Sequence, residues 1–111
     1  MQYGLNEITI KKIQNIFSSY PQLEKAIIYG SRAKGNYKPA SDIDLTLFGE
    51  TLTFASLQKM ERQLDDLLMP YKIDLSIFHQ ISNPDLIEHI VRAGKVFYES
   101  KEGNYPTEGI I

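Results

Sequence analysis

Two short segments of this chain alternate strictly between apolar and polar residues, and the polar side of each carries aspartate. The segments are residues 42–48 and 72–78. Their apolar positions are Ile43, Leu45, Leu47, Ile73, Leu75 and Ile77. Their acidic positions are Asp42, Asp44 and Asp74. Because successive side chains of a strand point to opposite faces, both segments predict half-buried strands of one sheet. Packing the apolar sides against helices would turn all three aspartates to the same open face.

Three other segments show the three- and four-residue spacing of amphipathic helices. They span about residues 6–20, residues 53–69 before Pro70, and residues 84–93. The last begins with Asn83 as a candidate N-cap, followed by proline at the first helical position. These three segments therefore predict the helices that cover the sheet.

Two apolar runs complete the predicted sheet. Residues 25–29 form a short β-prone run that ends at Gly30, and residues 96–98 suit an edge strand that could pair with a second copy in a homodimer. The order predicts a small α/β (α+β) fold with a mixed sheet of three to five strands and helices on one face. We assign the domain to residues 1–100 and expect residues 101–111, which lack periodicity, to form a mobile tail.

Composition narrows the function classes. The chain has 111 residues, which suits one domain, and its net charge of −2 argues against binding nucleic acid through a bulk basic surface. We therefore expect no direct nucleic-acid contact. There is no cysteine, so thiol catalysis and thiolate metal sites are excluded. No apolar segment reaches the ~20 residues that cross a bilayer, so we expect a cytoplasmic protein without membrane contact.

The three aspartates predict a metal site. Carboxylates gathered on one surface repel one another unless a cation neutralises them. Oxygen ligands favour Mg²⁺, with Mn²⁺ as a substitute, and Mg²⁺ in proteins is bound by one or two carboxylates together with substrate phosphates. Asp42, Asp44 and Asp74 are therefore our candidate metal ligands.

A glycine-serine turn and a basic loop follow the first predicted strand. Gly30 allows close approach of a ligand to the backbone, and the Ser31 hydroxyl can contact phosphate oxygens. Arg32, Lys34 and Lys38 supply positive charge, and Lys38 lies furthest from the turn. A phosphate-binding turn beside a metal site predicts phosphoryl or nucleotidyl transfer.

These motifs resemble a known family. Gly30-Ser31, ten further residues, Asp42-Ile43-Asp44 and a later Asp74 resemble the signature of the DNA polymerase β-like nucleotidyltransferases. The run from Tyr29 to Leu45 is similar to the minimal nucleotidyltransferases (MNT), the antitoxins of modules whose toxin is an all-helical HEPN ribonuclease. The resemblance spans about residues 5–98 and implies the polymerase β-like fold.

The resemblance also implies roles for individual residues. Gly30 and Ser31 would hold the triphosphate of ATP, with Arg32 and Lys34 beside them. Asp42 and Asp44 would bind two Mg²⁺ ions, and Asp74 would complete the second metal position and help to deprotonate the acceptor. The implied activity is transfer of AMP from ATP to a tyrosine hydroxyl of the HEPN toxin. Lys34 stands where many relatives carry arginine, which could weaken phosphate binding.

Two other functions stay open at this point. The chain could neutralise its toxin by occlusion, without catalysis, although no catalytic acid is missing from the motif. Alternatively it could adenylylate a small hydroxylated molecule, with a helical partner subunit completing the pocket. The three hypotheses differ in whether protein, small molecule or nothing receives the AMP.

The histidines and one tail tyrosine lie outside these motifs. His79 shares the parity of the apolar strand residues, and His89 lies on a predicted helix. We interpret both histidines as structural or surface residues. Tyr105 is a weak candidate for self-modification, supported only by its position in the expected tail.

Overall fold

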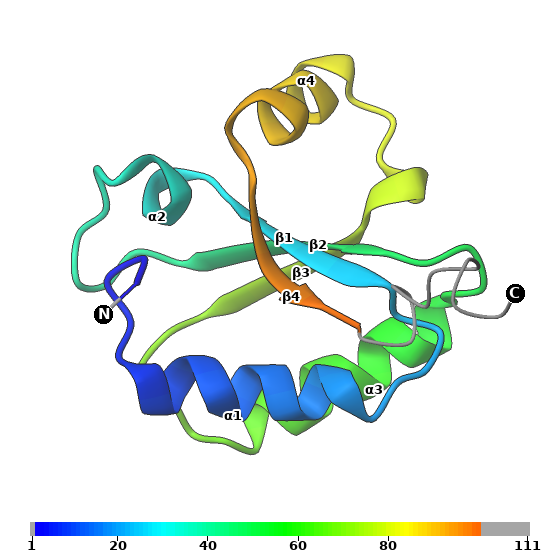
Figure 1. Ribbon diagram of the computed structural model, residues 1–111, viewed down its shortest axis with the longest axis horizontal. Coiled ribbons are helices and arrows are strands. Elements are labelled where there is room, and N and C mark those ends of the chain that lie inside the picture. Colours follow the sequence, from blue (N-terminus) through cyan, green and yellow to red (C-terminus); the bar gives the residue numbers. More distant parts are fainter. Residues whose placement is uncertain (1, 101–111) are drawn as a thin grey trace, which may run out of the picture.

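The computed structural model describes residues 2–100 of the chain (Figure 1). Its elements in chain order are α1 (Glu7–Ser18), β1 (Lys25–Tyr29), α2 (Ser31–Lys34), β2 (Ile43–Phe48), α3 (Phe54–Asp65), β3 (Ile73–Ile77), the 3₁₀ turn η1 (Phe78–Gln80), α4 (Pro84–Ala93) and β4 (Lys95–Glu99). Every predicted strand and helix is present. The expected tail and Tyr105 lie outside the described residues.

The four strands form one mixed sheet in the order β3-β2-β1-β4. Strand β1 is antiparallel to both β2 and β4, whereas β2 and β3 are parallel. The parallel pair requires a crossover, which α3 provides, and it places Asp44 directly opposite Asp74. The predicted α+β fold with a mixed sheet is confirmed.

Helices α1 and α3 cover one face of the sheet (Figure 1), which we call the closed face. The apolar residues of the strands point into this layer, and Ile28, Ile43, Leu45 and Leu47 are completely buried there. Ile13 and Phe17 of α1 and Met60 of α3 are also fully buried in the same core. The hydrophobic periodicity of the sequence therefore encodes this layer directly.

The opposite face, which we call the open face, is covered in part by α4. In Figure 1 this helix lies on the other side of the sheet from α1 and α3. A Cβ at Gly94, just after α4, would lie only 2.5 Å from Cγ2 of Ile27, so helix end and strand are in close contact. The expectation that all helices pack on one face is therefore wrong for α4, which packs on the same face as the acids.

Helix α3 ends earlier than the sequence pattern predicted. It stops at Asp65, and the chain turns through Leu68, whose φ is +55° and whose side chain is 89% exposed. The apolar spacing up to Met69 continued the helical pattern, but Leu68 does not reach the core. Within residues 2–100, no helix is long and apolar enough to cross a membrane.

Candidate functional site

Two of the three predicted ligands meet on the open face. Asp44 of β2 and Asp74 of β3 are register partners in the parallel ladder, so their side chains project side by side. Asp42 lies two residues before Asp44, outside the strand, and is exposed. The alternation of the sequence predicted this shared face, and the register of the parallel pair places Asp44 opposite Asp74.

The acids influence one another electrostatically. Burial raises the pKa of Asp44 above its ordinary value, and the negative charges of Asp74 and Asp42 raise it further. The positive charge of Lys72 acts in the opposite direction on the pKa of Asp44. A carboxyl group whose charged form is disfavoured in this way would gain from a bound cation.

Asp44 and Asp74 suit a metal ion that takes some of its ligands from outside this protein. Within residues 2–100, no three acidic or histidine side chains converge closely enough to enclose an ion alone. Asp44 and Asp74 offer adjacent carboxylates, the oxygen donors that Mg²⁺ prefers, and Mg²⁺ commonly takes its other ligands from water and substrate phosphates. The donor set therefore fits Mg²⁺ that takes its other ligands from water and phosphate oxygens.

Gly30 lies directly against the acid pair, at the end of β1. Its φ of +76° disfavours any other residue, and a Cβ there would lie 2.5 Å from Oδ2 of Asp44. The turn leads into α2, where the Lys34 N–H donates to the Gly30 carbonyl and the Gly35 N–H donates to that of Ser31. Gly30 thus lies beside Asp44, and Ser31 follows it as the first residue of α2.

Arg32 has a different environment from the one we expected. It is only 2% exposed, and its guanidinium donates to the carbonyl oxygens of Tyr3, Pro39 and Ser41. The group also lies over the rings of Tyr37 and Tyr71, 5.3 and 4.9 Å from their centroids. These contacts hold the loop between α2 and β2 and engage its guanidinium nitrogens with protein, so we do not include Arg32 among the proposed phosphate contacts.

Three lysines lie on segments that lead from Gly30 or into Asp74. Lys34 and Lys38 are exposed on the loop that follows Gly30. Lys72 shares the parity of Asp74, and its positive charge lowers the pKa of Asp44. Lys72 belongs to none of the motifs found in the sequence, although its parity with Asp74 was a usable signal.

Beyond the acids, the open face becomes less polar. The Ser76 hydroxyl donates to Thr46 Oγ1 at 2.9 Å, and Phe48 stacks on Phe78 with ring centroids 4.4 Å apart. Tyr29 is half-buried beside them, and burial raises the pKa of its phenol, with Asp44 and Asp74 adding to the rise and a hydrogen bond with Ser76 opposing it. A half-buried phenol with a raised pKa stays protonated at neutral pH and is a poor nucleophile.

The two histidines differ. His79 is exposed in η1, because β3 ends at Ile77, so it is a surface residue despite its parity with the apolar strand positions. His89 of α4 reaches the site, where its Nε2 accepts a hydrogen bond from the Gly30 N–H at 3.2 Å. No motif marked His89, since 59 residues separate it from Gly30.

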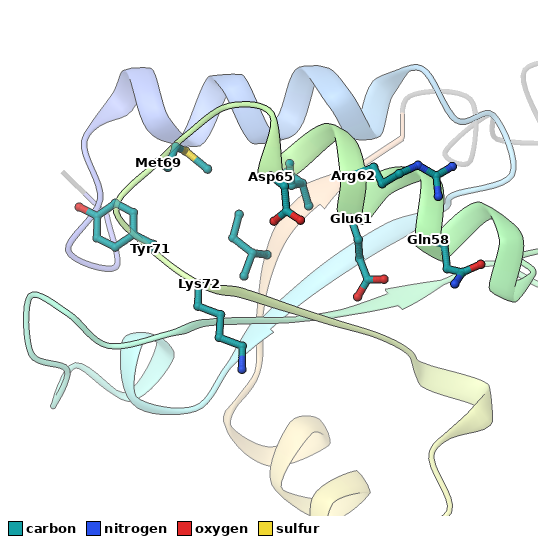
Figure 2. A pocket seen from close by; sticks show the side chains of 9 residues that line it. Gln58, Glu61, Arg62, Asp65, Met69, Tyr71 and Lys72 are labelled. Carbon is teal, nitrogen blue, oxygen red and sulfur yellow. The ribbon is translucent and has the colours of Figure 1, made fainter.

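A cavity of about 450 Å³ lies between α3 and the segment before β3 (Figure 2), and Lys72 is the residue that it shares with the surroundings of the acid pair. Figure 2 shows Glu61 and Asp65 on α3 above it, while Lys72 extends from the start of β3 away from that helix. Neither Asp44 nor Asp74 lines it. The cavity is therefore separate from the acid pair.

Comparison with solved structures finds the same fold. A chain of a toxin–antitoxin complex with AMP-PNP superposes with a TM-score of 0.66 at 24% identity, over 96% of this chain and 85% of that one. A chain from the complex of tri-AMPylated Shewanella oneidensis HEPN toxin with MNT antitoxin gives 0.63 at 20%, over 88% and 76%. A chain of the MntA–HepT toxin–antitoxin complex gives 0.63 at 20%, over 87% and 75%. At these identities the likeness establishes the fold.

Comparison of the sequence with known families is more specific. No curated protein matches the chain. The family described as polymerase beta nucleotidyltransferase matches residues 11–103, which include β1, the glycine-serine turn and all three aspartates. The resemblance expected from the motifs is therefore confirmed, and the chain belongs to the polymerase beta nucleotidyltransferase family.

Proposed function

We propose that this chain is a Mg²⁺-dependent adenylyltransferase that transfers AMP from ATP to a tyrosine hydroxyl of a HEPN toxin and so acts as its antitoxin. The observation that carries the proposal is the pairing of Asp44 with Asp74 directly beside Gly30. Structural likeness to toxin–antitoxin complexes, one with AMP-PNP and one with an AMPylated HEPN toxin, supports the partner and the transferred group.

Each residue has a defined task in this reaction. Gly30 and Ser31 contact the triphosphate, and exposed Lys34 offsets its charge. Asp42 and Asp44 are the proposed ligands of the metal that accompanies ATP, and Asp74 is the proposed ligand nearest the acceptor. When bound, the metal ions would neutralise phosphate charge and lower the pKa of the acceptor hydroxyl.

The chemistry is a displacement at the α-phosphorus. The tyrosine oxygen forms a bond to that phosphorus, the bond to the bridging oxygen of the β-phosphate breaks, and pyrophosphate leaves. The tyrosine proton passes to Asp74 and then to water. Burial, and then the negative charges of Asp74 and Asp42, raise the pKa of Asp44. Because these charges also oppose the approach of a triphosphate, metal and triphosphate should bind together rather than separately.

The test is incubation with ATP labelled at the α-phosphate, Mg²⁺ and a candidate HEPN toxin. We expect label on the toxin, and none with Asp44→Asn or Asp74→Asn. Asp65→Asn is the matched control, because Asp65 is an exposed carboxylate that lines the separate cavity. Label on a small hydroxylated molecule instead would change the acceptor class.

A toxin that is neutralised without receiving label would contradict the proposal and favour occlusion. Binding of ATP gives a second measurement that needs no partner. Equal affinity for ATP in Mg²⁺ and in excess chelator would remove the metal from the mechanism.

A further inference from the structure

His89 connects α4 with the end of β1. Its Nε2 accepts the hydrogen bond from the Gly30 N–H at 3.2 Å. Its ring also meets the ring of Tyr29 edge-on, with centroids 6.1 Å apart and planes at 76°. One imidazole thus contacts two consecutive residues at the point where the strand becomes the turn.

The peptide that joins Tyr29 to Gly30 sets the geometry of the turn. Gly30 has φ +76° and ψ −155°, and no side chain of the turn caps α2. The same residue lies against Oδ2 of Asp44. Rotation of this peptide would therefore move the turn relative to the carboxylate, and the hydrogen bond to His89 opposes that rotation.

Helix α4 is itself held firmly enough to act as a support. Asn83 caps its first turn by accepting from the N–H groups of Asp85 and Leu86. Ile90, the residue after His89, is 3% exposed, and Gly94 contacts Ile27 of β1. The imidazole is thus presented from a helix that packs on the same strand it contacts.

We propose that His89 is a positioning residue, which holds the Gly30 peptide in the orientation that binds the ATP triphosphate beside Asp44. The inference rests on the proposed nucleotide-binding function and adds a residue to that site. It requires a lone pair on Nε2 and thus the hydrogen on Nδ1. His89 acts through the turn and does not contact the reacting atoms.

Two substitutions separate the role of the Nε2 hydrogen-bond acceptor of His89 from that of its aromatic ring. His89→Phe keeps an aromatic ring against Tyr29 but removes the acceptor, whereas His89→Gln offers Oε1 near the position of Nε2. Glu88→Gln is the matched control, because Glu88 is the neighbouring exposed residue and pairs only with Arg92 among the described residues.

Two measurements decide the proposal. Hydrogen exchange of the Gly30 amide, followed by NMR, should accelerate in His89→Phe and stay slow in His89→Gln and Glu88→Gln. ATP·Mg²⁺ affinity should fall roughly five- to tenfold in His89→Phe, the effect of one lost hydrogen bond, and recover in His89→Gln. The KM for ATP should rise accordingly, while the KM for the acceptor stays unchanged.

Either of two results would overturn the proposal. Unchanged exchange at Gly30 in His89→Phe would show that His89 does not hold the turn. Faster exchange with unchanged ATP affinity would show that the turn needs no such support. If the parent protein itself binds no ATP, the proposed function fails first, and the exchange experiment alone still decides whether His89 holds Gly30.

Discussion

The two faces of the sheet are built from alternate residues of the same strands, yet they follow opposite rules. On the closed face Leu45 is completely buried among apolar side chains. On the open face its neighbour Asp44 is partly buried beside other acids, which raises its pKa. The closed face thus supports folding, whereas the open face carries a destabilising group that is explained by binding a ligand.

The largest effect should come from Asp44→Asn. We expect transfer of AMP to fall by at least ~10²–10³-fold, because an amide cannot replace a carboxylate as a metal ligand and electrostatic stabiliser. Toxin labelling measures the loss, and thermal unfolding measures stability. In the absence of metal, Asp44→Asn should unfold at a slightly higher temperature than the parent. If Asp44→Asn were markedly less stable than the parent, the functional interpretation of this face would be contradicted.

The reciprocal change on the closed face is Leu45→Ala, one residue along β2. It should lower the free energy of unfolding by about 2–5 kcal/mol, because it leaves a cavity in a fully buried layer. Urea unfolding measures this. If the variant is as stable as the parent, the closed face does not provide the core. Where enough folded protein remains, its transfer rate per folded molecule should change far less than in Asp44→Asn.

Gly30→Ala tests the contact between the turn and the acid. The added Cβ faces both an unfavourable positive φ and Oδ2 of Asp44, so we expect a loss of about 1–2 kcal/mol in stability and weaker ATP binding. Calorimetry with ATP·Mg²⁺ measures the second effect. Gly35→Ala is the control, since Gly35 also has positive φ but open space around its Cβ position. Equal ATP affinities in the two variants would argue against a role for Gly30 in binding.

The smallest predicted effect is the pH dependence of the metal-free protein. The pKa of Asp44 is higher in the folded chain than its ordinary 3.8, so the folded state binds more protons between these two values. The contribution of Asp44 to stability should therefore increase as pH falls through the folded pKa towards 3.8. Partial exposure should keep the effect below about 1 kcal/mol.

Urea unfolding of the parent and Asp44→Asn at several pH values measures this contribution. The difference in stability between them should be largest at neutral pH, in favour of the variant, and should shrink on acidification. A difference that does not vary with pH would show that the crowding of Asp44 has no energetic consequence.

The elements of the closed face could be predicted well because their signals are local. The period of two in β2 and β3, and the helical spacing in α1, reflect which side of each segment contacts the core. The end of α3 could not be predicted in this way, because Leu68 continues the apolar spacing but lies outside the core. Periodicity reports what a side chain could contact and not whether the backbone brings it there.

The open face could be predicted only in part. The motif located Gly30, Asp44 and Asp74, and the alternation indicated that the acids share a face. The environment of Arg32 could not be predicted, because its carbonyl partners come from Tyr3 and from the loop before β2. A positive charge in a polar loop led us to expect solvent or phosphate as the partner of Arg32. Only the folded chain shows that backbone carbonyl groups surround its guanidinium.

The sequence by itself determined the alternation of acids and apolar residues, the glycine turn and the family to which the chain belongs. Only the tertiary structure decided the side-by-side placement of Asp44 and Asp74, the burial of Arg32 and the contact of His89 with Gly30. The physical reason is the separation along the chain between the residues that interact. Side-chain direction follows from the backbone geometry of a few neighbouring residues, whereas contacts between distant segments depend on how the crossover and α4 pack on the sheet.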